Sequence, residues 1–448
     1  MSILPKVLAL LAAIGAVYLG KLAINAESYQ FDVWKCAKWH NQIVASIVAQ
    51  SNKTIVSQKF SEVYANSEGT YPFQGSLTPS TIAFLDQLDV ISNVPFTPNL
   101  AMPEPSSFWT YQITALNNPY PSAIQLYADV NNPSAGLFLD QRTHYATYFN
   151  SDEGFPRRDE WWPLEMALKR YSKLHLGGKY RLASTGQSIS IQPYAKVDVA
   201  IALAHYESLV DGILFRMQSG DLTKRPLVSA QKLAEWNVRG FAADFLSQAR
   251  TPTFKYIAPG ITLPSDDQFD LVMRQKYGTP ERKKALNPSG DLETLLLFPS
   301  ETKVSEETLS AHPRDYLFSN SAGVYLRPTK EYADGFQFVT PFHLGKNGHL
   351  RRGNSPMFNS QDPVDPYWSM EGLDVLYQHG SCPFLPKHHA RLASLIQLWG
   401  INVRKEHFKV GPEGVEGDME VYKLADTQGH GGIDFDSNIC WTDGVDPL

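Results

Sequence analysis

Apolar side chains recur at intervals of three and four residues over several long stretches of the chain, which is the spacing of amphipathic helices. This pattern predicts one long helix or two over residues 31–64, and a helix over 80–91 that is opened by Thr78 and Pro79. Further helices are expected over four later stretches: 197–218, 227–249, 266–277 and 291–298. Gly240 falls inside one of these patterns and weakens it, because glycine costs stability in the interior of a helix.

Strand-like patterns are fewer and shorter. Residues 122–130 and 181–193 look like strands, and apolar side chains take alternate positions between 322 and 338. Four prolines between residues 93 and 107 predict an irregular linker or an extended surface strap. The pattern as a whole predicts an α+β fold that is helix-dominated, with small antiparallel β elements in the middle and the last third.

The first 26 residues have the pattern of an export segment. Lys6 is followed by an uninterrupted apolar run of 14 residues, 7–20, which fits the core of a signal peptide and is short for a bilayer span of about 20 residues. Lys21 can snorkel, which would lengthen the span to Ile24 and leave an uncleaved anchor. Either outcome places the body of the chain outside the cytosol, whereas a buried N-terminal helix is the alternative.

The chain divides, on these patterns, into four segments. They are a signal peptide or signal anchor (1–26), a helical region with a proline-rich strap (27–107), a central α-rich region (108–300) and a C-terminal α+β region (301–448), although 27–448 can also form one continuous domain. A chain of 448 residues can bury an extensive core without disulfides. Among its three cysteines, Cys382 and Cys440 are the expected pair, since both fall late in the chain.

Charge and missing motifs exclude several functional classes. A net charge of -6 argues against a nucleic-acid partner, because a phosphate backbone is bound by clustered Lys and Arg. The run Glu281 to Lys284 is the one compact basic stretch, and we interpret it as a solvated helix face. The chain contains no Gly-x-Ser-x-Gly elbow, Walker loop, dinucleotide fingerprint or Cys-x-x-Cys pair. These absences exclude the usual serine hydrolases, nucleotide enzymes, simple dehydrogenases and thioredoxin-like proteins.

The stretch HGSCPFLPKHHARLASLIQLWG, residues 379–400, combines histidines with the start of a helix. Pro386 suits the first helical turn, and His388 lies four residues before Leu392 on the predicted buried face. The positive end of the helix dipole favours neutral imidazole, which is the form that binds metals. We therefore hypothesise a mononuclear divalent metal site formed by His379, His388 and His430, against the alternative of ordinary packed or exposed histidines.

Locally, the run from Cys382 through His388 and the following His-Ala-Arg-Leu resembles the histidine-bearing helix of the type 3 copper proteins, the tyrosinase and haemocyanin group. That resemblance would imply a coupled copper pair held by six histidines on several helices. The chain departs from the pattern, because Ala393 stands where aspartate is usual and no His-x-x-x-His pair occurs. The resemblance is confined to this segment and does not assign the chain to that family.

Two further groups are candidates for chemistry. His205 and Glu207, on the predicted helix over 197–218, suggest general acid-base catalysis, with a hydrogen-bonded core histidine as the alternative. Asp266 and Asp270 have the spacing of a magnesium-binding helix in isoprenoid enzymes. Helix capping by Ser265, with acidic residues in the first turn, is the favoured interpretation of that second group.

The sequence thus predicts an exported or membrane-tethered enzyme that acts on a small organic substrate, apolar substrates included, by histidine and carboxylate or metal-assisted chemistry. Aromatic residues make up 12% of the chain, and they line apolar clefts as well as cores. His388 is the leading catalytic candidate, with His205 and Glu207 behind it. The competing hypothesis is a non-catalytic cell-envelope or surface component that assembles with protein partners.

Overall fold

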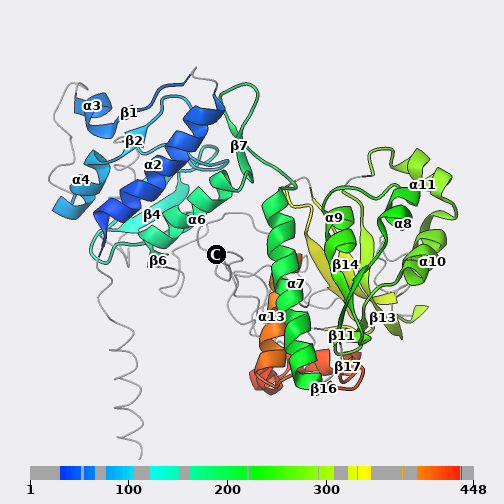
Figure 1. The fold of residues 1–448 in the computed structure, drawn as a ribbon. Helices are drawn as coiled ribbons and strands as arrows, with labels where there is room; N and C mark the ends of the chain where they lie inside the picture. The colour runs from blue at the N-terminus through cyan, green and yellow to red at the C-terminus, as the bar shows by residue number, and fades with distance from the viewer. Residues whose placement is uncertain are drawn as a thin grey trace, which may run out of the picture. The chain divides into compact units, whose positions relative to one another are not determined.

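The computed structural model describes twelve stretches of the chain: 31–51, 55–65, 77–104, 122–150, 161–218, 221–290, 292–306, 321–329, 331–344, 376, 391–433 and 435. The chain forms two compact units (Figure 1), which we call the first unit, residues 1–173 and 182–189, and the second unit, residues 174–181 and 190–448. The structure contains 43% helix and 23% strand, so the predicted helix-dominated α+β class is confirmed. The predicted four-segment division stays a prediction.

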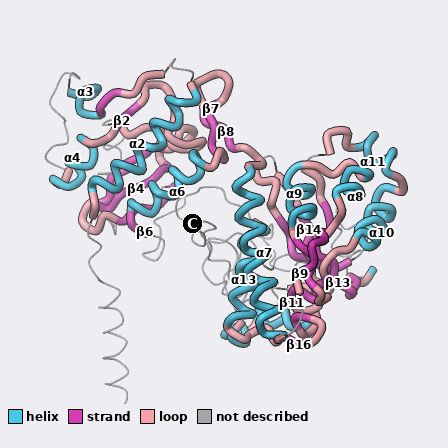
Figure 2. Tube along the Cα trace, in the orientation of Figure 1, coloured by secondary structure: helices cyan, strands magenta, loops and turns pink. Residues whose placement is uncertain are grey.

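The first unit packs helices against a four-stranded antiparallel sheet of order β3-β4-β5-β6 (Figure 2). Its helices are α2 (Val33–Gln50), α3 (Phe60–Ala65), α4 (Pro79–Asp86) and α6 (Leu164–Leu176), the last of which continues past the boundary of the unit. Its strands are β1 (Gln58–Lys59), β2 (Asp89–Val90), β3 (Ala123–Ala128), β4 (Ala135–Asp140), β5 (Tyr145–Asn150) and β6 (Trp162–Pro163). A short hairpin, β7 (Tyr180–Leu182) with β8 (Ile189–Ile191), occupies the predicted strand region 181–193.

Strand β4 is the centre of this sheet, and all six of its residues are buried. Gly136 has φ +150°, and a Cβ built there would overlap the carbonyl oxygen of Tyr127 on β3. Glycine is therefore required where the two strands approach most closely. The predicted pattern over 31–64 resolves into two helices, α2 and α3, because the short strand β1 separates them.

The core of the first unit contains a buried histidine, His40 on α2. Its Nε2 lies 2.7 Å from the carbonyl oxygen of Asp89, which can only accept, so Nε2 carries the proton. Its Nδ1 then accepts a hydrogen bond from the hydroxyl of Tyr127 at 2.9 Å, and its ring stacks on Phe96. Burial lowers the pKa of His40 to about 4, although the hydrogen bond to Asp89 works in the opposite direction.

This histidine should make the protein less stable in mild acid. The unfolded chain takes up a proton on His40 near pH 6.5, whereas the folded chain does so only near pH 4, so stability falls as the pH drops through that window. Between pH 7 and pH 5 we expect a loss of about 2 kcal/mol in the free energy of unfolding. Urea titrations of the wild-type protein and of the variant His40→Gln at both pH values measure it; an equal loss in the variant would contradict the assignment.

The second unit is built on a seven-stranded mixed sheet of order β15-β14-β13-β12-β11-β17-β16, in which only the β11–β17 pair is parallel among the pairs described. The sheet strands are β11 (Tyr256–Ala258), β12 (Ile261–Thr262), β13 (Leu295–Lys303), β14 (Ser321–Leu326), β15 (Phe336–Val339), β16 (Val410–Gly411) and β17 (Gly414–Val415). A separate pair joins β9 (Leu222–Pro226) to β10 (Arg250–Pro252).

Two long helices, α7 (Lys196–Met217) and α13 (Leu392–Arg404), lie side by side in the second unit (Figure 1). Trp399 of α13 is fully buried, with its ring centroid 6.2 Å from that of Phe298 and 6.3 Å from that of Phe338. The remaining helices are α8 (Ala230–Glu235), α9 (Gly240–Gln248), α10 (Asp266–Tyr277), α11 (Pro280–Leu286), and the 3-10 helices η4 (Met419–Asp426) and η5 (Gln428–Gly432). The helix predicted after Pro386 is present as α13, but it begins at Leu392 with the extended Arg391 as its N-cap, so the predicted places of Pro386 in its first turn and of His388 on its buried face are wrong.

Two of the predicted helices are corrected by the structure. The pattern over 227–249 is broken into α8 and α9, because Asn237 and Gly240 both adopt positive φ, +47° and +63°, between them. The helix predicted over 291–298 is wrong, since β13 begins at Leu295. Its first four residues are all buried, and a short continuous apolar run fits a buried strand as well as a helix.

The described part of the chain includes no helix that combines the length and the apolar character needed to cross a bilayer. The apolar run over 7–20 lies outside the described residues, and so do Cys382 and Cys440. The predicted export segment and the predicted disulfide therefore stay predictions.

Candidate functional site

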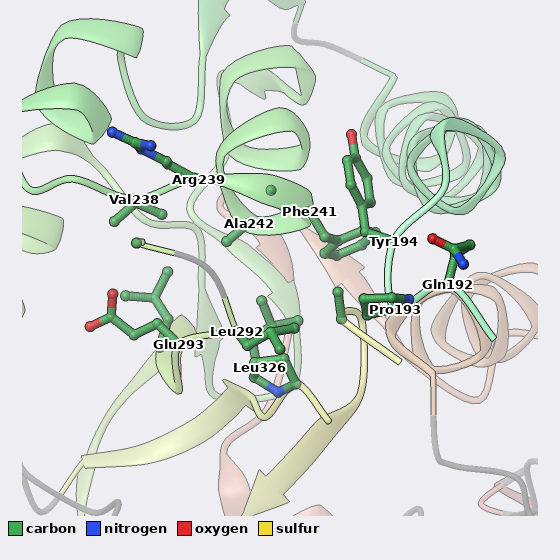
Figure 3. A pocket seen from close by; sticks show the side chains of 15 residues that line it. Gln192, Pro193, Tyr194, Val238, Arg239, Phe241, Ala242, Leu292, Glu293 and Leu326 are labelled. Carbon is green, nitrogen blue, oxygen red and sulfur yellow. The ribbon is translucent and has the colours of Figure 1, made fainter. Parts of the chain in front are cut away.

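A cavity of about 340 Å³ lies within the second unit, at the amino-terminal end of α9 (Figure 3). Four other segments complete its wall: the residues that lead into α7, the segment that precedes β13 together with the start of that strand, the end of β14, and the turn between β14 and β15. The residues that line it are Gln192, Pro193, Tyr194, Val238, Arg239, Gly240, Phe241, Ala242, Gly290, Leu292, Glu293, Leu295, Leu326, Pro328 and Ala333.

Most of this lining is apolar, and about half of it is buried. Phe241, Leu295 and Leu326 are at most 2% exposed, and Ala242 and Ala333 are also buried. Figure 3 shows the side chains of Ala242 and Leu326 directed towards the middle of the group from opposite walls. A cavity of this size, with a mainly apolar lining and few polar groups, has the properties of a small-molecule site.

The wall beside Leu292 contains a buried ion pair. Glu293 lines the cavity, and its Oε2 lies 2.7 Å from Nζ of Lys283, a side chain with no exposed surface. Tyr277 donates its hydroxyl proton to Oε1 of the same carboxylate, and burial together with this bond raises the pKa of Tyr277. In Figure 3 the carboxylate of Glu293 points away from the other lining side chains, so this residue presents its hydrocarbon stem to the cavity.

A second lysine lies close to this pair. Nζ of Lys276 is 3.9 Å from Oε1 of Glu293 and donates to the carbonyl oxygen of Thr294 at 2.8 Å. Burial lowers the pKa of Lys276 to about 8, against the attraction of Glu293. This wall therefore places two lysine amines around the carboxylate of Glu293. The amines compensate its negative charge, and the cavity surface itself stays apolar.

The loop that brings Leu292 and Glu293 to the cavity is anchored to the break between α8 and α9. The Asn237 side chain donates to the carbonyl oxygens of Asn287 at 3.1 Å and Pro288 at 3.2 Å. Gly290, with φ +71°, packs so closely that a Cβ there would overlap the carbonyl oxygen of Asn237. The same unusual backbone that interrupts the predicted helix thus positions this wall.

The opposite wall, Pro193 and Ala333, is supported by a buried network of four charged side chains: Lys179, Asp198, Asp334 and Arg391. The carbonyl oxygen of Pro193 accepts from Nζ of Lys179 at 3.2 Å and from the backbone N–H of Ala333 at 2.7 Å. These two bonds connect the charged network directly to the cavity lining.

Arg391 is the centre of that network. Its Nη2 lies 2.7 Å from Oδ1 of Asp198, and its Nε donates to the carboxylate of Asp334. Both carboxylates and the guanidinium are about 1% exposed. Asp198 also accepts from the backbone N–H of Ala195 at 2.9 Å, which caps the first turn of α7. The network therefore joins the starts of α7 and α13 to the turn between β14 and β15.

The same network holds Lys179, whose Nζ lies 3.5 Å from Asp198. Burial and the nearby Arg391 lower the pKa of Lys179 to about 8. The ring of Tyr332 lies next to both cations, with its centroid 4.7 Å from Nζ of Lys179 and 5.0 Å from the Arg391 guanidinium. Two positive and two negative side chains share this space, so it carries no net charge.

Tyr194 connects the segment before α7 to α9. Its hydroxyl donates to the carboxylate of Asp244, and burial followed by this bond raises the pKa of Tyr194. The phenol is thereby held as a fixed part of the cavity wall. The arrangement as a whole offers an apolar interior whose buried charged groups are paired around it, while Arg239, which also lines the cavity, is exposed.

The predicted catalytic residues His205 and Glu207 do not belong to this lining. His205 is half-buried on α7, where burial and the charge of Arg404 lower its pKa. Glu207 forms an exposed ion pair with Arg250 at 3.1 Å. Residues two apart on a helix do not face each other. The structure thus gives these two residues different neighbours, and their catalytic role stays a prediction.

The predicted metal ligands fall largely outside the described residues. His379 and His388 lie in the stretch 377–390, and only the backbone of His430, in η5, is described. Within the described part of the chain, no group of three His, Cys, Asp or Glu side chains is arranged to hold a metal ion. The divalent metal site therefore stays a prediction.

The acidic group on α10 has a structural role. Ser265 accepts a hydrogen bond from the backbone N–H of Gln268, so the predicted helix cap is confirmed. Asp266 accepts from the backbone N–H of Ser229 at 2.7 Å, at the start of α8. The carboxylate of Asp270 accepts from the indole N–H of Trp236, which contributes most to lowering its pKa to about 2. Asp266 and Asp270 thus make separate contacts within the fold.

The residues that form the cavity were not identified from the sequence. Lys283 was interpreted as part of a solvated face, yet it is fully buried, while its neighbour Lys284 is exposed. Arg391 directly follows the His-His-Ala run from which the metal site was predicted, but the sequence analysis assigned no role to Arg391. The available signal was apolar context, because both cations have apolar residues at neighbouring helical positions.

Comparisons of the chain with protein-family models, with curated proteins and with solved structures found no match.

Proposed function

We propose that the second unit binds a small, mainly apolar organic molecule in the cavity at the start of α9. The observation that carries the proposal is the combination of volume and lining: about 340 Å³ lined mainly by apolar residues, about half of which are buried. Small-molecule sites have volumes of about 300–1,000 Å³ and similar linings. This proposal agrees with the substrate class that the sequence predicts.

The energetics favour an apolar occupant. Removing apolar surface from water contributes roughly 25 cal/mol per Å², whereas a polar group placed against such a lining loses its hydrogen bonds to water. Glu293 and Asp334, the carboxylates nearest the two walls, are already paired with Lys283 and Arg391. Arg239, the other charged residue of the lining, is exposed, so the buried part of the cavity favours an apolar molecule, while an anionic group is tolerated beside Arg239.

Filling the cavity should weaken the binding of an apolar probe. The variant Ala242→Phe places a phenyl ring among the lining residues and should raise the Kd of an apolar fluorescent probe, N-phenyl-1-naphthylamine, by about tenfold or more. The matched control is Ala234→Phe, because Ala234 is an exposed alanine on the neighbouring helix α8. Fluorescence titration measures both values, and thermal unfolding confirms that each variant is folded.

A second variant enlarges a side chain on the opposite wall of the same cavity. Ala333→Leu should weaken probe binding in the same direction, since Ala333 is buried in the turn between β14 and β15. Probe binding that survives in both folded variants would locate the probe elsewhere and remove the support for the proposal.

We propose that the protein acts outside the cytosol, because the apolar run over 7–20 has the length of a signal-peptide core. The competing proposal is a surface component that assembles with protein partners. Phe215 favours it, because this side chain of α7 is 85% exposed. An assembly component does not need a ligand in the cavity, so the probe titration also separates the two proposals.

A further inference from the structure

Ser80 and His144 of the first unit form a hydrogen-bonded pair. The hydroxyl oxygen of Ser80 lies 2.9 Å from Nε2 of His144, although the two residues are 64 positions apart in the chain. Both side chains are half-buried, so neither is sealed in the core. A serine hydroxyl in direct contact with an imidazole nitrogen is the arrangement that activates a nucleophile.

The fold holds the serine firmly. Thr78 caps α4, Pro79 is the first residue of that helix, and Ser80 follows in its first turn. The backbone N–H of Thr78 donates to the side chain of Gln141 at 2.8 Å, in the turn between β4 and β5. Two bonds, this one and the Ser80–His144 contact, therefore fasten the start of α4 to the turn that contains His144.

The imidazole is also held in place. His144 has φ +59°, in the left-handed region, which few residues with a side chain adopt. Phe31 stacks on its ring, with centroids 4.2 Å apart and the two planes nearly parallel. Burial lowers the pKa of His144, whereas Asp140 raises it, and the first effect is larger. The ring is therefore neutral near pH 7, with a lone pair available on Nε2 when Nδ1 carries the proton.

A buried carboxylate, that of Asp140, is close enough to this ring for its charge to raise the pKa of His144. Asp140 is 5% exposed and accepts from the hydroxyls of Ser122 at 2.5 Å and Thr143 at 3.0 Å, and from the backbone N–H of Arg142 at 3.1 Å. Because these bonds fix its position, its negative charge is available to stabilise an imidazolium formed at His144.

We propose that Ser80 is a nucleophile activated by His144, and that this pair cleaves a small uncharged carboxylic ester. Ser80 and His144 are the catalytic residues, and Asp140 is a positioning and electrostatic residue. This activity is independent of ligand binding by the second unit. It does not need the Gly-x-Ser-x-Gly elbow that the sequence lacks, because the pair is assembled by a helix start and a distant turn.

The reaction is an acyl transfer in two steps. The Ser80 oxygen adds to the ester carbonyl carbon while its proton moves to Nε2 of His144; the bond to the alkoxy oxygen then breaks, and the alcohol leaves with that proton. A water molecule next gives a proton to His144 and adds to the acyl carbon, which releases the carboxylic acid and restores the Ser80 hydroxyl. In the first turn of α4, Pro79 has no N–H and the N–H groups of Thr81 and Ile82 donate to Thr78, so the N–H of Ser80 is the donor of this turn that a developing oxyanion would use.

The substrate class follows from the surroundings of the pair. The half-buried ring of Phe31 stacks on His144 and packs edge to face on the buried Phe84, with centroids 6.1 Å apart, so Phe31 offers apolar surface beside the pair that suits an apolar acyl group. The negative charge of Asp140 disfavours an anionic substrate. A short, uncharged ester satisfies both conditions.

The direct test is covalent labelling of the full-length protein with a fluorophosphonate, which forms an oxygen–phosphorus bond at an activated serine and releases fluoride. Mass spectrometry of the digested protein should locate the label on Ser80. The variant His144→Gln keeps a polar partner but removes the base, and should slow labelling by about 100-fold or more. Ser46→Ala is the control, because Ser46 on α2 contacts the side chain of Gln50 and takes no part in the bonds that hold Ser80, His144 or Asp140, and Ser80 should label normally in this variant.

The outcomes separate a nucleophile from a residue that only fastens α4 to the sheet. Label on Ser80 that depends on His144 supports the proposal. An unlabelled Ser80 in the wild-type protein after prolonged exposure to excess reagent, or equal rates in wild type and His144→Gln, would overturn it. The wild-type result needs no variant, so a substitution that fails to fold cannot obscure the answer.

Discussion

Replacing Arg391 with methionine should lower the free energy of unfolding by about 3–5 kcal/mol, because the change leaves the buried Asp334 without its ion-pair partner and Asp198 with Lys179 alone. Asp198 and Asp334 are both about 1% exposed and both contact the guanidinium. Methionine preserves much of the side-chain length, so the loss reports the missing charge and hydrogen bonds rather than a large cavity. Urea unfolding followed by tryptophan fluorescence measures it.

The control for this variant is Arg404→Met on the same helix. Arg404 is exposed in the last turn of α13, and its replacement removes the same charge at a cost of less than about 1 kcal/mol. Equal losses in the two variants would mean that the buried network does not contribute more than an exposed charge, and that the wall formed by Pro193 and Ala333 is held by other contacts.

Replacing Lys283 with methionine should cost a similar amount, about 3–5 kcal/mol, on the other wall of the cavity. Glu293 would lose the partner that lies 2.7 Å from its Oε2, and the carbonyl oxygen of Asn237 would lose a donor at 3.0 Å. Lys284 provides a matched control because it is the next residue, carries the same charge and is exposed. The variant Lys284→Met should unfold within about 0.5 kcal/mol of the wild-type protein.

A double variant tests the cause of that loss. Adding Glu293→Gln to Lys283→Met removes the stranded negative charge, so the double variant should regain a large part of the lost stability. If instead the two losses simply add, the destabilisation comes from packing around Lys283 and not from the ion pair.

The helices of the second unit were predictable where their signals were local. Ser265 caps α10 as its sequence indicates, and α13 places Leu392, Ile396 and Trp399 in the core at helical spacing. Such signals depend on neighbours in the chain, so a pattern of a few residues is sufficient. The same applies to the alternation that predicts β14 and β15.

The errors arose where distant contacts decide the local structure. Leu295 to Phe298 pair with β14, and an apolar run this short does not distinguish a strand from a helix. The pattern over 227–249 is broken because Asn237 donates to carbonyl groups some 50 positions away. Neither contact leaves a periodic signal in the sequence.

The cavity itself could not be predicted for the same reason. Its lining comes from segments as far apart as Gln192 and Ala333, and its charged supports, Lys283 and Arg391, have the appearance of surface residues in the sequence. The sequence shows an aromatic-rich protein, and the small organic substrate predicted from it, apolar substrates included, stays a prediction. The predicted catalytic residues included histidines because imidazole serves as an acid, a base or a metal ligand. The cavity lining, however, does not include His205.

The most direct test of ligand binding by the second unit is a methyl NMR titration of the full-length protein, labelled at alanine and leucine, with N-phenyl-1-naphthylamine. The account predicts that the methyl signals of Ala242, Leu326 and Ala333 shift together and saturate at one molecule per chain, while that of Leu286, which is 66% exposed on α11, stays in place. Unchanged signals from the three lining residues, with shifts confined to exposed methyl groups, would contradict it.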